Sequence, residues 1–167
     1  MQKESPLNSS CLSVENNKDK DNIQVLVRIR PLSSKEVSEG SHSCLIADDQ
    51  DPQKITLDCK TDVKSFLFDY VAMEKITQID FFELVGKPLS HICLDGYNLC
   101  VFAYGQTGAG KTYTMQGKID LDTERGLQPN VFNYLFKLMG NLRDEWDYQV
   151  RCSYLEIYNE QINDLVI

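Results

Sequence analysis

A glycine-rich segment in the middle of the chain has the residue types and spacing of a phosphate-binding loop. It fits the pattern G-x-x-x-x-G-K-[ST] and consists of Gly105, Gln106, Thr107, Gly108, Ala109, Gly110, Lys111 and Thr112. Glycines let successive backbone N–H groups converge on an anion, the lysine adds positive charge, and the threonine hydroxyl suits Mg²⁺. A plain strand-to-helix turn also uses glycines, but this full pattern favours binding of a nucleoside triphosphate with Mg²⁺.

A second group of residues offers flat surfaces on which a purine base could stack. Arg28 and Arg30 alternate along one strand face and are followed by Pro31, and Tyr113 comes directly after the loop threonine. Guanidinium, pyrrolidine and phenol groups all pack on aromatic rings. Arginines on a strand are more often a solvated face, so this interpretation depends on the loop beside it.

The loop must be positioned by regular elements on either side. Residues 99–104 are a continuous apolar run, typical of a strand buried on both faces of a parallel sheet, and a helix is expected to start at the end of the loop. Residues 23–30 alternate as a strand that Pro31 ends. Short strands around Leu45, residues 55–57 and residues 66–68 predict a small peripheral sheet.

Two helices and a later strand complete the expected elements. Thr77 and Asp80 form a capping box ahead of apolar residues at helical spacing, and Gly96 ends that helix. Pro88 inside the pattern should kink or interrupt the helix. Pro129 opens a second amphipathic helix, and residues 148–158 alternate as a strand.

Composition and charge limit the classes of function. Hydrophobic residues make up 42% of the 167 residues, and the net charge is −8, which argues against a broad electrostatic attraction to nucleic acid or anionic membrane. No stretch approaches the roughly 20 apolar residues of a membrane span. The six cysteines contain no C-x-x-C pair, so we expect reduced cytosolic thiols and no zinc site. Residues 1–21 are polar and predict a disordered tail.

Several motifs together resemble the kinesin motor domain. They are VRIRP at 27–31, FD at 68–69, GYN at 96–98, FAYGQTGAGKTYTM at 102–115, GLQP at 126–129 and SYLEIYNEQI at 153–162. The resemblance implies an α/β P-loop NTPase fold with a mixed central sheet and flanking helices, incomplete in this chain. The FDYVA stretch at 68–72 and residues 156–164 are most similar to the spindle-associated kinesin-twelve group.

The resemblance also implies roles for particular residues. ATP and Mg²⁺ are the implied cofactors, with the phosphates on the loop from Gly105 to Thr112 and Mg²⁺ on the hydroxyl of Thr112. The implied adenine-binding residues are Arg28, Arg30, Pro31 and Tyr113. Residues 22–167 would be the N-terminal part of a motor domain, truncated before the switch I pattern N-x-x-S-S-R and the switch II pattern D-x-x-G-x-E, neither of which occurs here. No catalytic residue is therefore expected in this chain.

A parent protein of this family would be a microtubule-dependent ATPase of the cytoplasm and cytoskeleton, with the spindle as one location. Its partners would be microtubules, contacted mostly through segments absent here, and a second copy joined by a coiled coil outside this chain. No nucleic acid or membrane partner is expected.

The truncation has a structural consequence and leaves alternatives open. In the family's sheet, the strand at 99–104 lies between two strands from the second half of the domain, and it would lack both here. One alternative is a truncated, hydrolysis-incompetent nucleotide-binding or interaction protein with a partial kinesin fold. Another is an unrelated P-loop kinase. Sequence beyond Ile167 would separate these alternatives.

Overall fold

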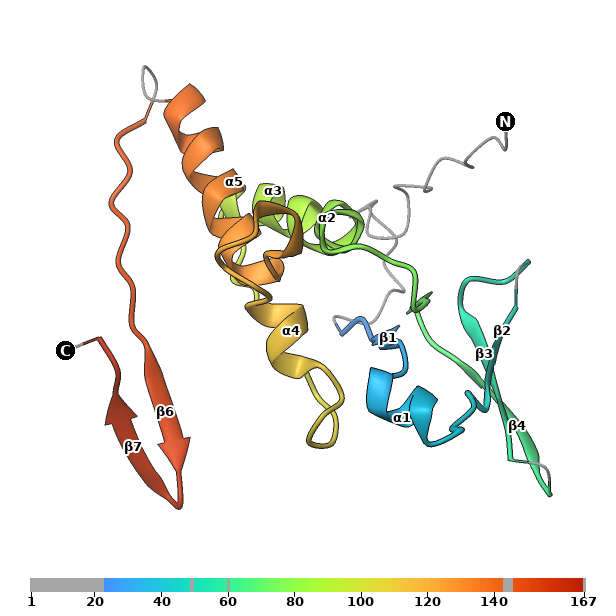
Figure 1. Ribbon diagram of the computed structural model, residues 1–167. Helices are drawn as coiled ribbons and strands as arrows, with labels where there is room; N and C mark the ends of the chain where they lie inside the picture. Colours follow the sequence, from blue (N-terminus) through green and yellow to red (C-terminus); the bar gives the residue numbers. More distant parts are fainter. Residues whose placement is uncertain (1–22, 49, 60, 143–145, 167) are drawn as a thin grey trace. The chain divides into compact units, whose positions relative to one another are not determined.

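The computed structural model describes residues 23–48, 50–59, 61–142 and 146–166 (Figure 1). The chain divides into two units, residues 1–134 and 135–167, which are described separately below. The tail predicted at residues 1–21 lies outside the described residues. Within the described residues, no helix is both long enough and apolar enough to cross a bilayer.

A short parallel strand pair forms the centre of the first unit. Strand β1 (Leu26–Arg28) pairs with β5 (Tyr70–Ala72), and the ladder is extended by a bond of 2.9 Å from the Ile29 N–H to the Ala72 carbonyl. Ile29 and Val71 are buried there. Of the strand expected at residues 23–30, only residues 26–28 are confirmed as a strand.

The predicted peripheral sheet is confirmed. Strands β2 (Leu45–Ala47), β3 (Lys54–Asp58) and β4 (Val63–Leu67) form an antiparallel sheet in the order β2-β3-β4. Ile55 of β3 joins the buried cluster of Ile29 and Val71, which fixes this sheet to the β1–β5 pair.

A helix that the sequence analysis did not predict follows β1. Helix α1 (Ser34–Ser38) begins with a capping box in which Ser33 and Glu36 satisfy each other's backbone N–H groups. The signal was present in the sequence as S-x-x-E. It was missed because no apolar periodicity accompanies it, and none of the residues in this helix is buried.

The helix predicted from Thr77 is confirmed, with its capping box to Asp80. It runs through α2 (Gln78–Phe81), a π-helical turn η2 (Phe82–Gly86) and α3 (Lys87–Leu94), and Gly96 follows at φ +95°. The interruption expected at Pro88 takes the form of the π turn. The proline then lies in the first turn of α3, where a missing N–H costs little.

The main core lies between this helical run and the start of the last helix. Phe81, Leu84 and Val85 pack against Ala72 of β5 and Leu127 of α5 (Leu127–Asn141). Helix α5 begins at Leu127, so the expectation that Pro129 opens it is wrong by two residues. The proline still lies within the first turn, where the helix backbone has no N–H partner to lose.

The expected strand at residues 99–104 does not form. No ladder includes these residues, and Phe102 and Tyr104 are 78% and 95% exposed. A strand cannot exist without a neighbour to receive its backbone hydrogen bonds. The described residues provide none at this position. The next elements are α4 (Lys111–Met115) and a 3₁₀ turn, η3 (Asp122–Glu124).

The second unit contains the end of α5 and a hairpin. Strands β6 (Leu155–Tyr158) and β7 (Gln161–Asp164) pair across a turn in which Asn159 and Glu160 have φ of 49° and 61°. Of the strand predicted at residues 148–158, only this last part is paired. The Tyr154 carbonyl accepts a further bond from the Leu165 N–H at 2.7 Å, and residues 148–153 belong to no ladder among the described residues.

Candidate functional site

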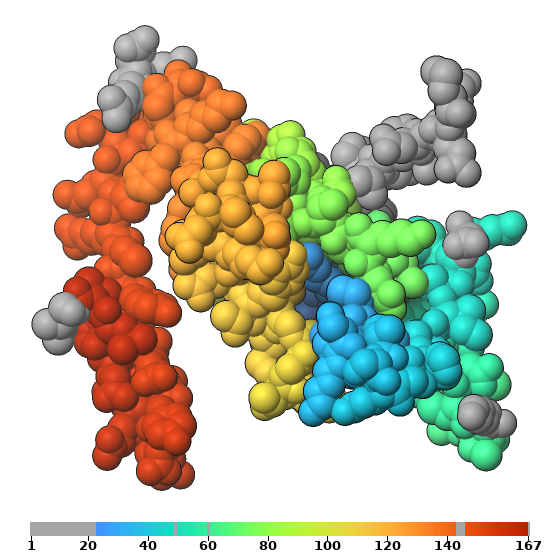
Figure 2. All heavy atoms as spheres, in the orientation of Figure 1, coloured from blue at the N-terminus to red at the C-terminus, as the bar shows by residue number. Residues whose placement is uncertain are grey.

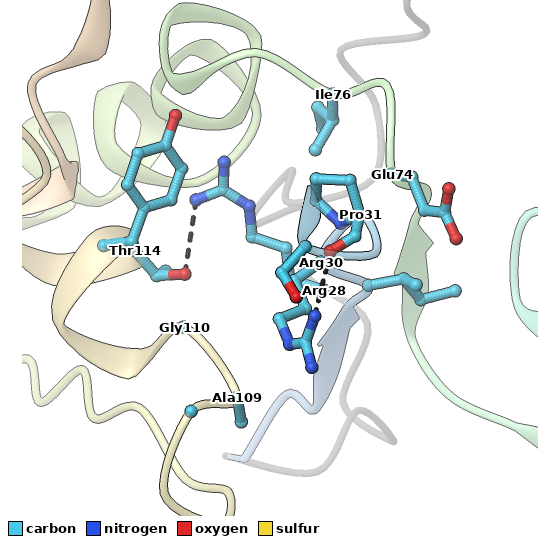
Figure 3. Close-up of a pocket in the computed structure, with 12 residues that line it drawn as sticks. Arg28, Arg30, Pro31, Glu74, Ile76, Ala109, Gly110 and Thr114 are labelled. Carbon is cyan, nitrogen blue, oxygen red and sulfur yellow. Dashed lines mark hydrogen bonds between the residues drawn. The ribbon is translucent and has the colours of Figure 1, made fainter. Parts of the chain in front are cut away.

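A pocket of about 560 Å³ lies in the first unit, where the end of β1 meets the glycine-rich loop. Three segments line it: the residues at and after the end of β1, the turn before α2, and the loop with the start of α4 (Figure 3). The lining residues are Arg28, Ile29, Arg30, Pro31, Ser33, Glu74, Ile76, Gly108, Ala109, Gly110, Tyr113 and Thr114. A Cβ built on Gly110 would lie 4.0 Å from the Arg30 Cβ, so loop and strand end are in van der Waals range. Figure 2 shows the yellow loop region against the blue residues after β1.

All four predicted base-stacking residues therefore reach one pocket. Arg28, Arg30 and Pro31 arrive from β1 and the turn after it, and Tyr113 arrives from α4, where its side chain is 43% exposed. The predicted phosphate-binding loop divides in two. Gly108, Ala109 and Gly110 line the pocket, whereas Gly105, Gln106, Thr107, Lys111 and Thr112 do not.

The loop adopts a conformation that requires its glycines. Gly105, Gly108 and Gly110 have φ of +153°, +81° and +96°, values that residues with a Cβ adopt only under strain. The Lys111 ammonium lies across the loop and donates to the carbonyls of Gly105 (2.8 Å) and Gln106 (3.0 Å). Its positive charge is thus held beside the loop without a carboxylate partner among the described residues.

Arg28 is held in place by both polar and aromatic contacts. Its Nη1 donates to Gln78 Oε1 (2.8 Å) and to Thr114 Oγ1 (3.3 Å). Its guanidinium carbon lies 4.6 Å from the ring centroid of Phe81 and 5.5 Å from that of Tyr113. Burial lowers the pKa of Arg28, with a smaller opposing effect from Tyr113. Arginine remains charged throughout the ordinary pH range, so the pocket wall carries a fixed positive charge.

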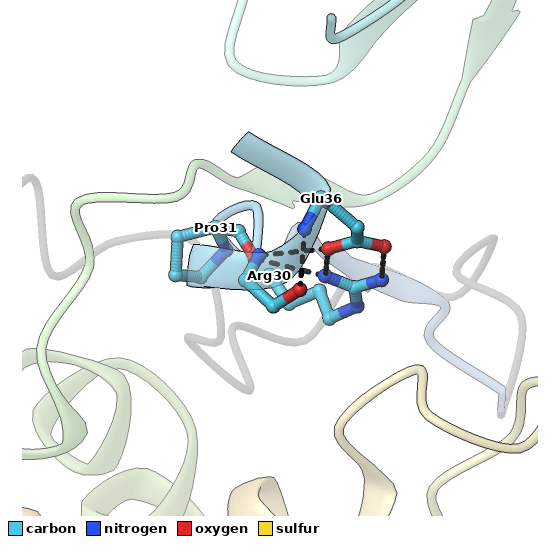
Figure 4. Close-up of polar contacts among 4 residues, drawn as sticks. Arg30, Pro31 and Glu36 are labelled. Carbon is cyan, nitrogen blue, oxygen red and sulfur yellow. Dashed lines mark hydrogen bonds and ion pairs between the residues drawn. The ribbon is translucent and has the colours of Figure 1, made fainter. Parts of the chain in front are cut away.

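Arg30 has a different partner. Its guanidinium makes a two-pronged ion pair with Glu36, with Nη2 to Oε1 at 2.5 Å and Nη1 to Oε2 at 2.8 Å, and Nη1 also donates to the Pro31 carbonyl (Figure 4). The hydrogen bond from Arg30, followed by those from Ser33, lowers the pKa of Glu36 far below its usual range. The same bond raises the pKa of Arg30. The two arginines thus share the pocket but are anchored to different elements.

Sequence reasoning missed two residues that hold this site. Glu36 could have been found from its capping box with Ser33. Gln78 carries no motif, and only the structure shows that its side chain, 3% exposed, contacts Arg28 and the backbone of α4. Glu74 and Ile76, from the turn before α2, complete the pocket wall opposite the loop.

Comparison with known proteins identifies what this arrangement is similar to. A family model described as the kinesin motor domain matches residues 28–167. Kinesin-like protein KIN-12E of Oryza sativa subsp. japonica is 44% identical over 156 residues, which covers 87% of this chain and 8% of that protein. Kinesin-like protein KIN-12D of Arabidopsis thaliana is also 44% identical, over 87% of this chain and 6% of its own length.

A solved structure, that of a fast kinesin, superimposes with a TM-score of 0.81 at 40% identity. It covers 86% of this chain, and this chain covers 40% of it. The expected P-loop NTPase fold of the kinesin-motor type is thereby confirmed, as a partial α/β fragment. The expected likeness to the kinesin-twelve group is also supported. The chain spans less than half of the solved structure and less than a tenth of the two plant relatives.

Proposed function

This chain belongs to the kinesin motor domain family, and on that premise we propose that it is the ATP-binding portion of a motor that couples ATP hydrolysis to movement along microtubules. The observation that carries the proposal is the pocket itself. Its volume of about 560 Å³ falls in the range of small-molecule sites. It joins a cationic and aromatic wall to a glycine-rich loop, as a nucleotide requires. The comparisons give no separate support to a truncated protein without motor function.

The residues divide the nucleotide between them. Arg28, Arg30, Pro31 and Tyr113 take the adenine, because they present flat and cationic groups to one cavity. The phosphates lie on the loop, from Gly105, Gln106, Thr107, Gly108, Ala109 and Gly110 to Lys111 and Thr112.

Lys111 and Thr112 contact the phosphates and the Mg²⁺ that accompanies them. Lys111 now bonds two loop carbonyls, and on ATP binding it exchanges them for phosphate oxygens, which are stronger acceptors. The exposed hydroxyl of Thr112 is the protein ligand for Mg²⁺. When bound, Mg²⁺ neutralises charge on the β- and γ-phosphates. We assign no residue of this chain to orient the attacking water, and the part that we propose for this segment is ATP binding.

The parent protein, in this proposal, acts on microtubules in the cytoskeleton, with the spindle as one location. It dimerises through a coiled coil outside this chain. The net charge of −8 repels this segment from a strongly acidic microtubule surface. In this proposal the parent protein therefore contacts the filament through other segments.

Equilibrium binding of a fluorescent ATP analogue with Mg²⁺ tests the nucleotide site. The 167-residue chain should bind the analogue and release it to unlabelled ATP. Lys111→Ala should weaken binding by about ten- to a hundredfold, because a hydrogen bond to a charged group contributes about 1.5–3 kcal/mol.

The matched control is Lys64→Ala, which removes an exposed lysine of β4 that pairs with Asp62 (2.7 Å) and does not line the pocket. This variant should bind the analogue as tightly as the unsubstituted 167-residue chain does. Failure of the unsubstituted 167-residue chain to bind, or equal binding by the Lys111 and Lys64 variants, would refute the nucleotide site.

A further inference from the structure

The described residues contain two buried polar side chains, Gln78 and Ser90, and they differ in what they contact. The Ser90 hydroxyl donates to the Gly86 carbonyl within its own helical run, at 2.7 Å. Gln78 instead reaches three other parts of the first unit. A buried amide costs free energy unless its donors and acceptor are paired, so the partners of Gln78 are informative.

Each polar atom of the Gln78 amide has a partner. Its Oε1 accepts from Arg28 Nη1 at 2.8 Å. Its Nε2 donates to the Tyr113 carbonyl at 2.6 Å and to the Glu124 carbonyl at 3.4 Å. The amide therefore joins α2 to the end of β1, to α4 and to the turn η3.

The bond to α4 replaces a helix bond that this short helix lacks. The N–H of Gly117 would pair with the Tyr113 carbonyl in a continuing α-helix, but it donates to the Thr112 carbonyl instead, at 3.0 Å. The Tyr113 carbonyl is one of the unpaired acceptors at a helix end, and Gln78 satisfies it. Gln78 thus holds the backbone of the residue whose ring faces the pocket.

The bond to Arg28 acts on a second side chain that lines the same pocket. The Arg28 guanidinium contacts the rings of both Phe81 and Tyr113, and its hydrogen bonds to Gln78 and Thr114 fix its rotation. One buried amide therefore contacts both Arg28 and Tyr113, which line the pocket and which we propose to take the adenine.

We infer that Gln78 is a positioning residue for the base-binding half of the nucleotide site: it holds the Arg28 side chain and the Tyr113 backbone in place where both residues line the pocket. This inference rests on the proposed function, and it adds a residue that touches no ligand. Gln78 does not contact Lys111 or the loop from Gly105 to Gly110 in any described hydrogen bond. Its loss should therefore weaken contacts with the base and spare those with the phosphates.

Competition binding with two ligands tests this separation. ATP and inorganic tripolyphosphate, each with Mg²⁺, are titrated against the fluorescent ATP analogue. Gln78→Met keeps the volume of the side chain and removes its hydrogen bonds. The Kd for ATP should rise about tenfold, equivalent to ~1.4 kcal/mol, while the Kd for tripolyphosphate stays within about twofold of the parent. Ser90→Ala, the buried polar control, should change neither value.

A second comparison asks whether Gln78 acts through Arg28. In an Arg28→Met background, Gln78→Met should raise the Kd for ATP by less than about threefold, because the guanidinium that it orients is gone and only its bond to the Tyr113 carbonyl is left to lose. A full tenfold rise in that background overturns the inference, as does an equal loss of ATP and tripolyphosphate binding. Circular dichroism checks the fold of each variant, and Gln78→Asn replaces Gln78→Met if the latter does not fold.

The outcomes separate this inference from the proposed function. A parent chain that binds no ATP overturns both. A parent chain that binds ATP, together with a Gln78→Met variant that binds it equally well, overturns the positioning role alone.

Discussion

Replacing Phe81 tests whether a residue of the hydrophobic core is energetically coupled to Arg28 in the pocket wall. Phe81 is 6% exposed and packs with Ala72, Leu84 and Leu127. The centroid of its ring also lies 4.6 Å from the guanidinium carbon of Arg28. Truncation to alanine should cost about 3–5 kcal/mol of unfolding free energy through the cavity alone.

Phe81→Leu separates the two contributions. Leucine keeps most of the apolar volume, so the packing cost should stay under about 1.5 kcal/mol. Loss of the cation–π contact with a half-buried guanidinium adds about 0.5–2 kcal/mol. We therefore expect a total of about 1–3 kcal/mol, measured by urea unfolding followed by circular dichroism.

A double-mutant cycle with Arg28→Met isolates the cation–π contact, because costs that belong to one residue alone cancel. The coupling between Phe81→Leu and Arg28→Met should be about 0.5–2 kcal/mol. Phe82→Leu is the control, since that ring meets Tyr134 edge-on at 5.7 Å and has no described contact with Arg28. Its cycle should be additive to within about 0.5 kcal/mol. Equal coupling in the two cycles would refute the reasoning.

Three further predictions follow from the structure. The pKa of Glu36 is lowered in the folded state. Its contribution to the stability of α1 is therefore present above the unfolded pKa of about 4.3 and is lost as the pH falls through the folded pKa. Glu36→Gln should flatten this loss of α1 stability in acid, as followed by NMR, and Glu39→Gln should leave it intact. Gly86→Ala should destabilise by about 1–3 kcal/mol, because its Cβ would lie 2.5 Å from Phe82 Cδ2 and 2.9 Å from Leu127 Cδ1; Gly140→Ala, with open space, should be neutral or stabilising in the same urea assay, and the reverse order would count against the packing described here. Amides of residues 99–104 should exchange hydrogen within about tenfold of unstructured rates, whereas strong protection would mean that these residues have strand partners.

Local rules account for the parts of the fold that could be predicted. The capping box of Thr77 and Asp80, the helix end before Gly96 and the three short strands of the peripheral sheet follow from residue types within a few positions of each other. The short-range interactions that specify such elements are contained in the sequence segment itself. The same holds for the glycine-rich loop, whose positive φ values match the glycines that the motif requires.

Residues 99–104 show where local rules fail. Their apolar character predicts a buried strand, but strand formation depends on partners elsewhere in the chain, and the described residues form none there. The prediction of helix α1 failed in the opposite way. Its capping signal was present in the sequence, but no apolar face accompanied it.

The sequence by itself determined the pattern of a phosphate-binding loop, which residue types could stack on a base, and which family the chain resembles. Only the tertiary structure decided how those residues are held. Arg28 and Arg30 alternate in the sequence as on one strand, yet one is anchored by Gln78 and the other, beyond the end of β1, by Glu36. Gln78 lies 50 residues from Arg28 in sequence, and no local pattern encodes a contact across that separation. The contact depends on the packing of α2 beside β1 and α4. A buried amide costs free energy unless it is hydrogen-bonded, and here its partners come from segments distant in the sequence.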